Sequence, residues 1–185
     1  MQQYLSRINE TFFRFKEHFL PWKTLDPSRT TQEKIFKKYG QNNVIIKDYS
    51  VIYTHKKKHF RNNFLIYADA DFGYIFMKNQ FALASMWFDV IFENKKKILF
   101  VKQIQGIRGK KDELKKFRWE RMLLYFLIDS AKKAGFHKIR VVKSTNQSWH
   151  TSANGKNFHM RYDVSAKREG FSLTDKYHTL EISNG

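Results

Sequence analysis

The chain has 185 residues, with 35 lysine and arginine residues against 17 aspartate and glutamate residues and a formal net charge of +18. It contains no cysteine, which excludes disulfide frameworks, thiolate zinc sites and thiol nucleophiles. Apolar residues make up 42% of the chain, enough for one packed domain. Charged side chains interrupt residues 1–22, so we expect no secretory signal, no transmembrane segment and a cytoplasmic location.

The positive charge predicts an anionic partner. A net charge of +18 on 22.3 kDa exceeds what solubility alone requires, and such a field attracts polyanions in a manner that salt weakens. The candidate partners are tRNA or another nucleic acid, an anionic membrane face, an acidic acyl carrier protein, and a nucleotide-bearing donor such as coenzyme A. Charge alone does not choose among them, and the sequence does not indicate an oligomeric state.

Two helices are predicted at the start of the chain. Residues 5–20 carry apolar side chains at helical spacing. A basic amphipathic helix of this kind either packs across its own domain or lies on a membrane surface. A second helix is predicted to begin with Thr30 or Thr31 as its N-cap and to run through Tyr39.

We assign residues 1–42 to an N-terminal helical extension and residues 43–185 to an α/β domain. Within that domain, residues 43–78 have the composition of short strands joined by loops. The β-rich runs 80–93 and 97–105 are separated by three polar residues. This pattern predicts a hairpin that forms the central ribbon of a sheet.

A βαβ unit follows the predicted hairpin. Gly106 and Gly109 end the strand, and residues 115–134 have apolar side chains at helical spacing. Gly135 is placed to end that helix, and the β-branched run 137–143 predicts the next strand. A strand, helix and strand in this order favour a parallel crossover.

The last forty residues complete the predicted domain. Residues 144–157 are too polar for a core and indicate a loop close to a site. A helix is predicted over residues 159–169, and a hairpin over residues 171–182 that turns at Asp175 and Lys176.

This order of elements resembles the core of GNAT acyltransferases. The phrases that carry the resemblance are Leu123-Leu124, Ala131-Lys132-Lys133-Ala134-Gly135-Phe136, Lys138-Ile139-Arg140-Val141 and Lys167-Arg168-Glu169-Gly170-Phe171. The resemblance implies a GNAT-like mixed sheet with flanking helices, in the α/β (α+β) class. It also implies acyl- or aminoacyl-transferase activity, with acyl-CoA as the candidate cofactor.

The resemblance departs from the family at the donor site. GNAT proteins hold the coenzyme A pyrophosphate with a Q/R-x-x-G-x-G/A turn before a helix, where amides and the helix N-terminus bind anions. The matching stretch, residues 116–122, has Arg118 and Glu120 at the two glycine positions, and Ala166 stands where the family often has a catalytic tyrosine. We therefore expect weak binding of acetyl-CoA, and an acyl carrier protein or charged tRNA becomes a suitable donor.

A narrower resemblance, over residues 100–171, is to the VirK/YbjX family of bacterial proteins. It rests on Ile104-Gln105-Gly106 after a strand and on Tyr162-Asp163 placed eight residues ahead of Gly170. It implies a virulence or stress role without a settled reaction. The chain departs from the family pattern at Arg161, Ser165, Ala166 and Phe171.

Candidate catalytic and substrate-binding residues lie around the predicted loop. His150 is a candidate general base, and Tyr162 and Asp163 are candidate acid–base partners. Alternatively, Asp163 caps or pairs on a basic helix and Tyr162 packs. The candidate substrate-binding residues are Gln103 and Gln105, one strand period apart, together with Trp149. Edge-strand polarity also explains the two glutamines.

Basic residues near the βα turn are the candidate phosphate-binding group. Gly106 and Gly109 frame the turn, and side-chain charge replaces the missing glycine amides. The basic members are Arg108, Lys110, Lys111, Lys115, Lys116, Arg118 and Arg121. No metal site is assigned, because His55 and His59 flank three lysines. The rival functional class is a non-catalytic basic module that binds nucleic acid or an anionic surface.

Overall fold

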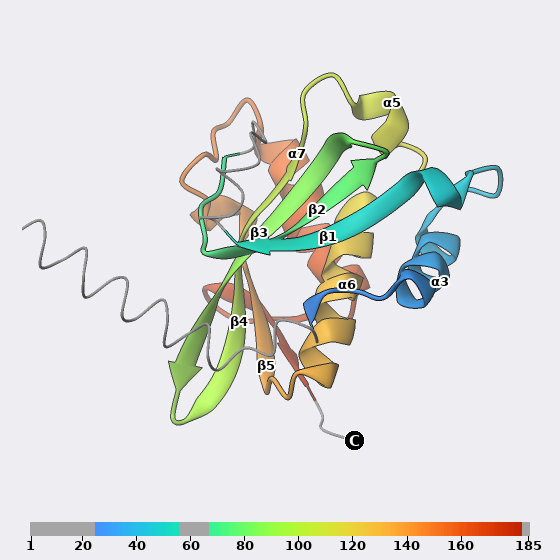
Figure 1. Ribbon diagram of the computed structural model, residues 1–185. Coiled ribbons are helices and arrows are strands. Elements are labelled where there is room, and N and C mark those ends of the chain that lie inside the picture. The colour runs from blue at the N-terminus through green and yellow to red at the C-terminus, as the bar shows by residue number, and fades with distance from the viewer. Residues whose placement is uncertain (1–24, 56–66, 183–185) are drawn as a thin grey trace, which may run out of the picture.

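A seven-stranded mixed sheet forms the centre of the protein (Figure 1). The computed structural model describes residues 25–55 and 67–182. The strand order is β1-β2-β3-β4-β5-β7-β6, and every neighbouring pair is antiparallel except β4 and β5. The strands are β1 (Tyr49–His55), β2 (Phe72–Lys78), β3 (Phe81–Glu93), β4 (Lys96–Gly106), β5 (Lys138–Val142), β6 (Ser172–Leu173) and β7 (Tyr177–Glu181). The predicted mixed α/β fold with flanking helices is confirmed.

Helices flank this sheet, and α3 and α6 lie together against one of its faces (Figure 1). Among the described residues, no helix is long and apolar enough to cross a membrane. The helical elements are α3 (Arg29–Tyr39), η1 (Ile46–Asp48), α5 (Lys111–Leu114), α6 (Trp119–Lys133), η2 (Ser144–Asn146), α7 (Gly155–His159), the π-turn η3 (Met160–Val164) and α8 (Ser165–Arg168).

The second predicted helix is α3, and its N-cap differs from the prediction. Ser28 caps it, because the Ser28 hydroxyl accepts a hydrogen bond from the amide of Thr31 at 3.3 Å. Thr30 and Thr31 lie inside the first turn. The predicted helix over residues 5–20 falls outside the described residues.

An aromatic core joins α3, α6 and the sheet. The fully buried ring of Phe36 on α3 lies 5.9 Å, centre to centre, from the rings of Phe76, Phe117 and Phe126. Aromatic pairs at this separation add stabilisation beyond the area they bury. The helix that follows the N-terminal segment therefore packs into the same core as the βαβ unit.

The predicted hairpin and crossover are both present. Asn94 and Lys95 have φ angles of 49° and 63° at the β3–β4 turn, as a two-residue turn between antiparallel strands requires. Helix α6 connects β4 to β5, whose residues 98–101 and 138–141 pair in parallel. The helix predicted over residues 159–169 begins earlier, at α7, and continues through η3 and α8.

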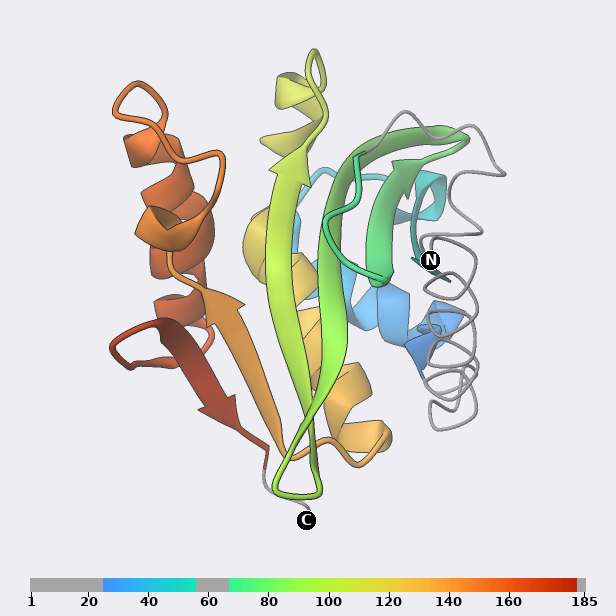
Figure 2. The same ribbon diagram turned by 90° about the vertical axis from the view of Figure 1, so that its left-hand side faces the viewer.

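Strands β4 and β5 part beyond Val101. On the β3 side, Phe88 pairs with Val101 and Trp87 pairs with Gln103, so Lys102 is an extra residue and forms a β-bulge in β4. On the other side, the pairing with β5 ends at Val101. Figure 2 shows the two strands diverging from their paired ends. Among the described strands, none therefore pairs with the β4 backbone on its β5 side from Lys102 onward.

A smaller cluster covers the sheet face away from α6. Ala68 and Ala70 pack there with Ile75, Met77 and the fully buried Trp87. Gly73 makes room for the indole, since a Cβ atom at Gly73 would lie 2.6 Å from the Trp87 ring and 2.9 Å from the Met86 carbonyl oxygen.

We expect Gly73→Ala to lower the free energy of unfolding by about 1–3 kcal/mol, the usual cost of overpacking. Urea denaturation of the variant and the parent protein measures this change. In a Trp87→Leu background, the added methyl group should cost less, because only its contact with the Met86 carbonyl oxygen remains. An equal cost in both backgrounds would show that contact with the indole is not the cause.

Candidate functional site

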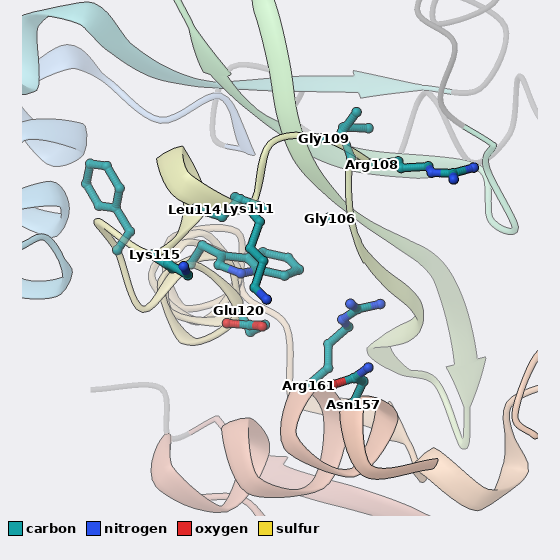
Figure 3. Close-up of a pocket in the computed structure, with 12 residues that line it drawn as sticks. Gly106, Arg108, Gly109, Lys111, Leu114, Lys115, Glu120, Asn157 and Arg161 are labelled. Atoms are coloured by element: carbon teal, nitrogen blue, oxygen red, sulfur yellow. The ribbon is translucent and has the colours of Figure 1, made fainter. Parts of the chain in front are cut away.

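A cavity of about 450 Å³ lies beyond the carboxyl end of β4 (Figure 3). We call it the β4–α6 pocket. The β4–α5 loop, helix α5, the start of α6 and the helix run α7–η3 form its walls. Its lining residues are Gly106, Ile107, Arg108, Gly109, Lys111, Leu114, Lys115, Phe117, Trp119, Glu120, Asn157 and Arg161.

Two glycines shape the loop that opens the pocket. A Cβ atom at Gly106 would lie 2.9 Å from Leu114 Cδ1 and 3.4 Å from the Trp119 ring, so any larger residue here would force the Leu114 side chain to shift. Gly109 has a φ of +80°, in the left-handed region. These two positions explain why the strand stops and turns here.

Cations reach the pocket from two sides. In Figure 3, Lys111 comes from α5 and Arg161 from the opposite wall, and both side chains point toward the space between them. The guanidinium of Arg108 points away from that space. Among the described residues, Lys111 has no ion pair, and Lys115 pairs only with the almost fully exposed Asp112, at 3.3 Å. Such an exposed pair is weak, so these ammonium groups remain available to a ligand.

Arg161 is held loosely by the protein. Its Nη1 atom donates a long hydrogen bond of 3.4 Å to the carbonyl oxygen of Ile104. Its guanidinium lies 5.6 Å from the Trp119 ring centre and 5.9 Å from that of Phe158. Its Nε atom is buried and has no hydrogen-bond partner among the described residues.

Tyr162 occupies the gap between β4 and β5. Its hydroxyl accepts a hydrogen bond from the Ile104 amide at 2.8 Å and donates to the Ile104 carbonyl oxygen at 3.3 Å. Nearby, the Gln147 side-chain amide donates to the carbonyl oxygen of Lys102. Burial raises the pKa of Tyr162 to about 12, although the bond from the Ile104 amide and the charge of Arg161 oppose the shift. Side chains therefore replace β5 as partners of the β4 backbone.

Asp163 connects three separate elements. Its carboxylate accepts hydrogen bonds from the amide of Ser144 at 3.0 Å and from the Ser144 hydroxyl, and it contacts ring nitrogens of His159 and His178 at 2.9 Å each. Burial alone would raise the pKa of Asp163, but these hydrogen bonds outweigh burial and lower it to about 2. Asp163 thus ties the start of the polar loop to β7.

The three predicted catalytic side chains do not meet at one point. Tyr162 faces β4 and Asp163 faces Ser144 and His178. The ring of His150 packs edge-on against Phe158, with centres 6.0 Å apart. These contacts agree with the alternative given in the sequence analysis, in which Asp163 pairs with other side chains and Tyr162 packs.

The predicted substrate residues lie next to a second cavity of about 360 Å³ but do not line it. Gln103 accepts from the Asp69 amide at 3.1 Å and donates to Gln105 at 3.0 Å, so the two glutamines share one face. The Trp149 indole donates to the Asp69 carboxylate at 3.3 Å. The cavity itself is lined by Asp69, Phe100, Lys102, Val142, Asn146, Gln147 and Ser148.

The β4–α6 pocket contains only some of the predicted phosphate-binding residues. Gly106, Arg108, Gly109, Lys111 and Lys115 line it. In contrast, Lys116 pairs with Glu113 at 2.9 Å and Arg121 with Glu169 at 2.6 Å. Arg118 is exposed at the N-cap of α6, outside the lining.

Sequence reasoning missed the opposite wall of the pocket. Arg161 and Asn157 lie about fifty residues after the glycine turn, and only the return of the chain places them there. No local pattern marks either residue as pocket-lining. The one available signal was the proximity of Arg161 to the Tyr162-Asp163 pair.

Comparisons with known proteins identify no family. No family model matches the chain, and no curated protein matches it. Among solved structures, the crystal structures of wild-type TTHA1254 from Thermus thermophilus and of a point mutant are similar at a TM-score of 0.37 and 17% identity. The match covers 55% of this chain and 63% of that one, which is less than two thirds of its length.

We expect Tyr162→Phe to lower the free energy of unfolding by about 1–3 kcal/mol, because it leaves the buried Ile104 amide without a partner. Hydrogen exchange at the Ile104 amide should accelerate in parallel. Tyr125→Phe is the matched control, since the Tyr125 hydroxyl forms no hydrogen bond within the described residues. Unchanged exchange at Ile104 would contradict the role given to Tyr162.

Asp163→Asn tests the pH dependence of the Asp163 contacts. The pKa of Asp163 falls from 3.8 to about 2 on folding, so the carboxylate stabilises the fold above pH 4 and loses this effect as the pH drops through 2. We expect the stability advantage of the parent protein over the variant to shrink by about 2 kcal/mol across that range. Urea titrations at several pH values measure it, and a constant advantage would refute the assignment.

Proposed function

We propose that the chain binds a phosphate-bearing ligand or partner in the β4–α6 pocket, on a GNAT-like acyltransferase scaffold. One observation carries the proposal: Lys111, Lys115 and Arg161 converge where β4 ends and α6 begins. Ligands of α/β proteins collect beyond the carboxyl ends of strands. Charged donors form strong hydrogen bonds to phosphate oxygens.

The charge distribution of the chain supports this proposal. Its formal net charge of +18 would steer polyanions toward the surface, while Lys111, Lys115 and Arg161 in the pocket would fix the site of contact. Candidate ligands are nucleic acid including tRNA, an acyl carrier protein through its phosphopantetheine, and a nucleotide-bearing donor such as acyl-CoA. Binding of this kind suits a non-catalytic module, as a VirK/YbjX-like virulence or stress protein would be.

Acyl or aminoacyl transfer is a second candidate function. The observation that favours it is the position of the two cavities, since Gly106 of β4 lines one and Lys102 lines the other, with Ile104 between them. A donor held at the first cavity would extend along β4 toward an acceptor at the second. The Tyr162 side chain lies on that path and is hydrogen-bonded to the Ile104 backbone amide. Transfer would therefore require the Tyr162 side chain to move.

We expect the double variant Lys111→Glu and Lys115→Glu to weaken binding of labelled tRNA at least about tenfold, which corresponds to the loss of one or two charge-assisted hydrogen bonds. If the double variant instead weakens the binding of phosphopantetheinylated acyl carrier protein or of acetyl-CoA by a similar factor, that molecule is identified as the pocket ligand. Fluorescence anisotropy at fixed salt measures the first two ligands, and calorimetry measures the third.

The matched control is Lys95→Glu with Lys96→Glu, at the remote hairpin tip between β3 and β4. It changes the net charge by the same amount, and we expect a much smaller effect. If both double variants weaken binding equally, the charge acts as a diffuse coat and the localised pocket is refuted.

A further inference from the structure

Glu120 is the one carboxylate among the lining residues of the otherwise basic β4–α6 pocket. It lies in the first turn of α6, and Figure 3 shows its carboxylate on the same side as Lys111 and across from Arg161. Within the described part of the chain, no ion pair and no side-chain hydrogen bond reaches it. Burial raises the pKa of Glu120 above its ordinary value, while its own amide and the charge of Arg161 oppose the shift.

The other half-buried glutamates in the described part of the chain are paired. Glu113 contacts Lys116, Lys78 and the Tyr49 hydroxyl, and Glu169 contacts Arg121 and the Tyr39 hydroxyl. A carboxylate withdrawn from water is costly unless it gains such partners. The helix N-terminus favours an acidic residue in the first turn, but it does not explain why this one faces a cavity.

The opposite wall of the pocket carries a hydrogen-bond donor that no described residue satisfies. The buried Nε of Arg161 has no acceptor within residues 25–55 and 67–182, and the side chain of Asn157 projects beside Arg161 (Figure 3). Lys111 on one wall and the Arg161 side chain on the other therefore offer donors to the pocket, and Glu120 offers an acceptor on the Lys111 side. A bare polyphosphate would satisfy Lys111 and Arg161 but would place negative charge against Glu120. The ligand must carry hydrogen-bond donors as well as an anion.

We infer that the pocket takes a nucleotide with a free ribose diol, whose phosphates contact Lys111 and Arg161 while its hydroxyls donate to Glu120. The inference rests on the proposed function. Carboxylates bind ribose hydroxyls in the same way in dinucleotide sites, and a cavity of about 450 Å³ has the size of a small-ligand site. Free nucleotides and RNA 3′ ends both present this group. A 3′-phosphate, as in coenzyme A, would meet the Glu120 carboxylate and be rejected.

Calorimetry on the full chain at fixed salt tests the inference with ADP and adenosine 3′,5′-bisphosphate as probes. We expect ADP to bind about tenfold more tightly, the cost of one unpaired polar contact. Glu120→Gln should bind the bisphosphate more tightly than the parent protein does. Because this result is a gain of binding, a folding defect cannot produce it. Glu93→Gln, which makes the same charge change on β3 far from the pocket, should produce no gain.

A short RNA with a 3′-hydroxyl end, compared with the same RNA carrying a 3′-phosphate, separates the two sources of the diol. A preference for the hydroxyl end with RNA but not with mononucleotides assigns the pocket to an RNA terminus. If neither the mononucleotides nor the RNAs show a preference for the free hydroxyl, the role of Glu120 is overturned. The proposed function still holds in that case if the double variant Lys111→Glu and Lys115→Glu weakens binding. Insensitivity to those two lysines would instead refute the proposed function itself.

Discussion

The architecture depends on the parting of two neighbouring strands. The bulge at Lys102 and the end of β5 pairing at Val101 leave the backbone of β4 open on one side. Buried amides and carbonyls cannot remain without partners. Tyr162, Gln147 and Arg161 supply those partners from the segments after β5. The same parting allows a cavity at each end of the β4 segment from Lys102 to Gly106. The candidate sites are therefore consequences of how the sheet opens.

The distribution of charge follows a second constraint, which is that carboxylates are scarce. With 17 acidic residues against 35 basic ones, there are too few carboxylates for each cation to have a partner of its own. Several of the acids tie elements together, as Glu169 does for Arg121 and Tyr39 and as Asp163 does for Ser144 and His178. In the β4–α6 pocket, Lys111, Lys115 and Arg161 outnumber Glu120, the one carboxylate among the lining residues. An external anion would complete that place.

Local patterns predicted the elements that short-range rules determine. The hairpin was readable because Asn94 and Lys95 interrupt two β-rich runs, and the crossover was readable because glycines bracket a periodic helix. The partners across the fold were not readable. Arg161 reaches the pocket from an irregular helical run that contains a π-turn, and this shifts the side chains that a regular helix would present. The cap at Ser28 was missed because three hydroxyl residues stand together between Ser28 and Thr31, and spacing alone does not say which one is free of the helix.

Three consecutive residues of the π-turn contact three different parts of the protein. Arg161 faces the β4–α6 pocket, Tyr162 holds the open edge of β4, and Asp163 holds β7 and the polar loop. Both Arg161 and Tyr162 also contact the backbone of Ile104. A ligand at Arg161 would replace only its long bond to the Ile104 carbonyl, which Tyr162 also serves, whereas a ligand running along β4 would displace Tyr162 and strip the amide of its partner. Anion binding in the pocket therefore breaks fewer hydrogen bonds than group transfer along β4 would. This difference favours the proposed binding function over the proposed transfer function.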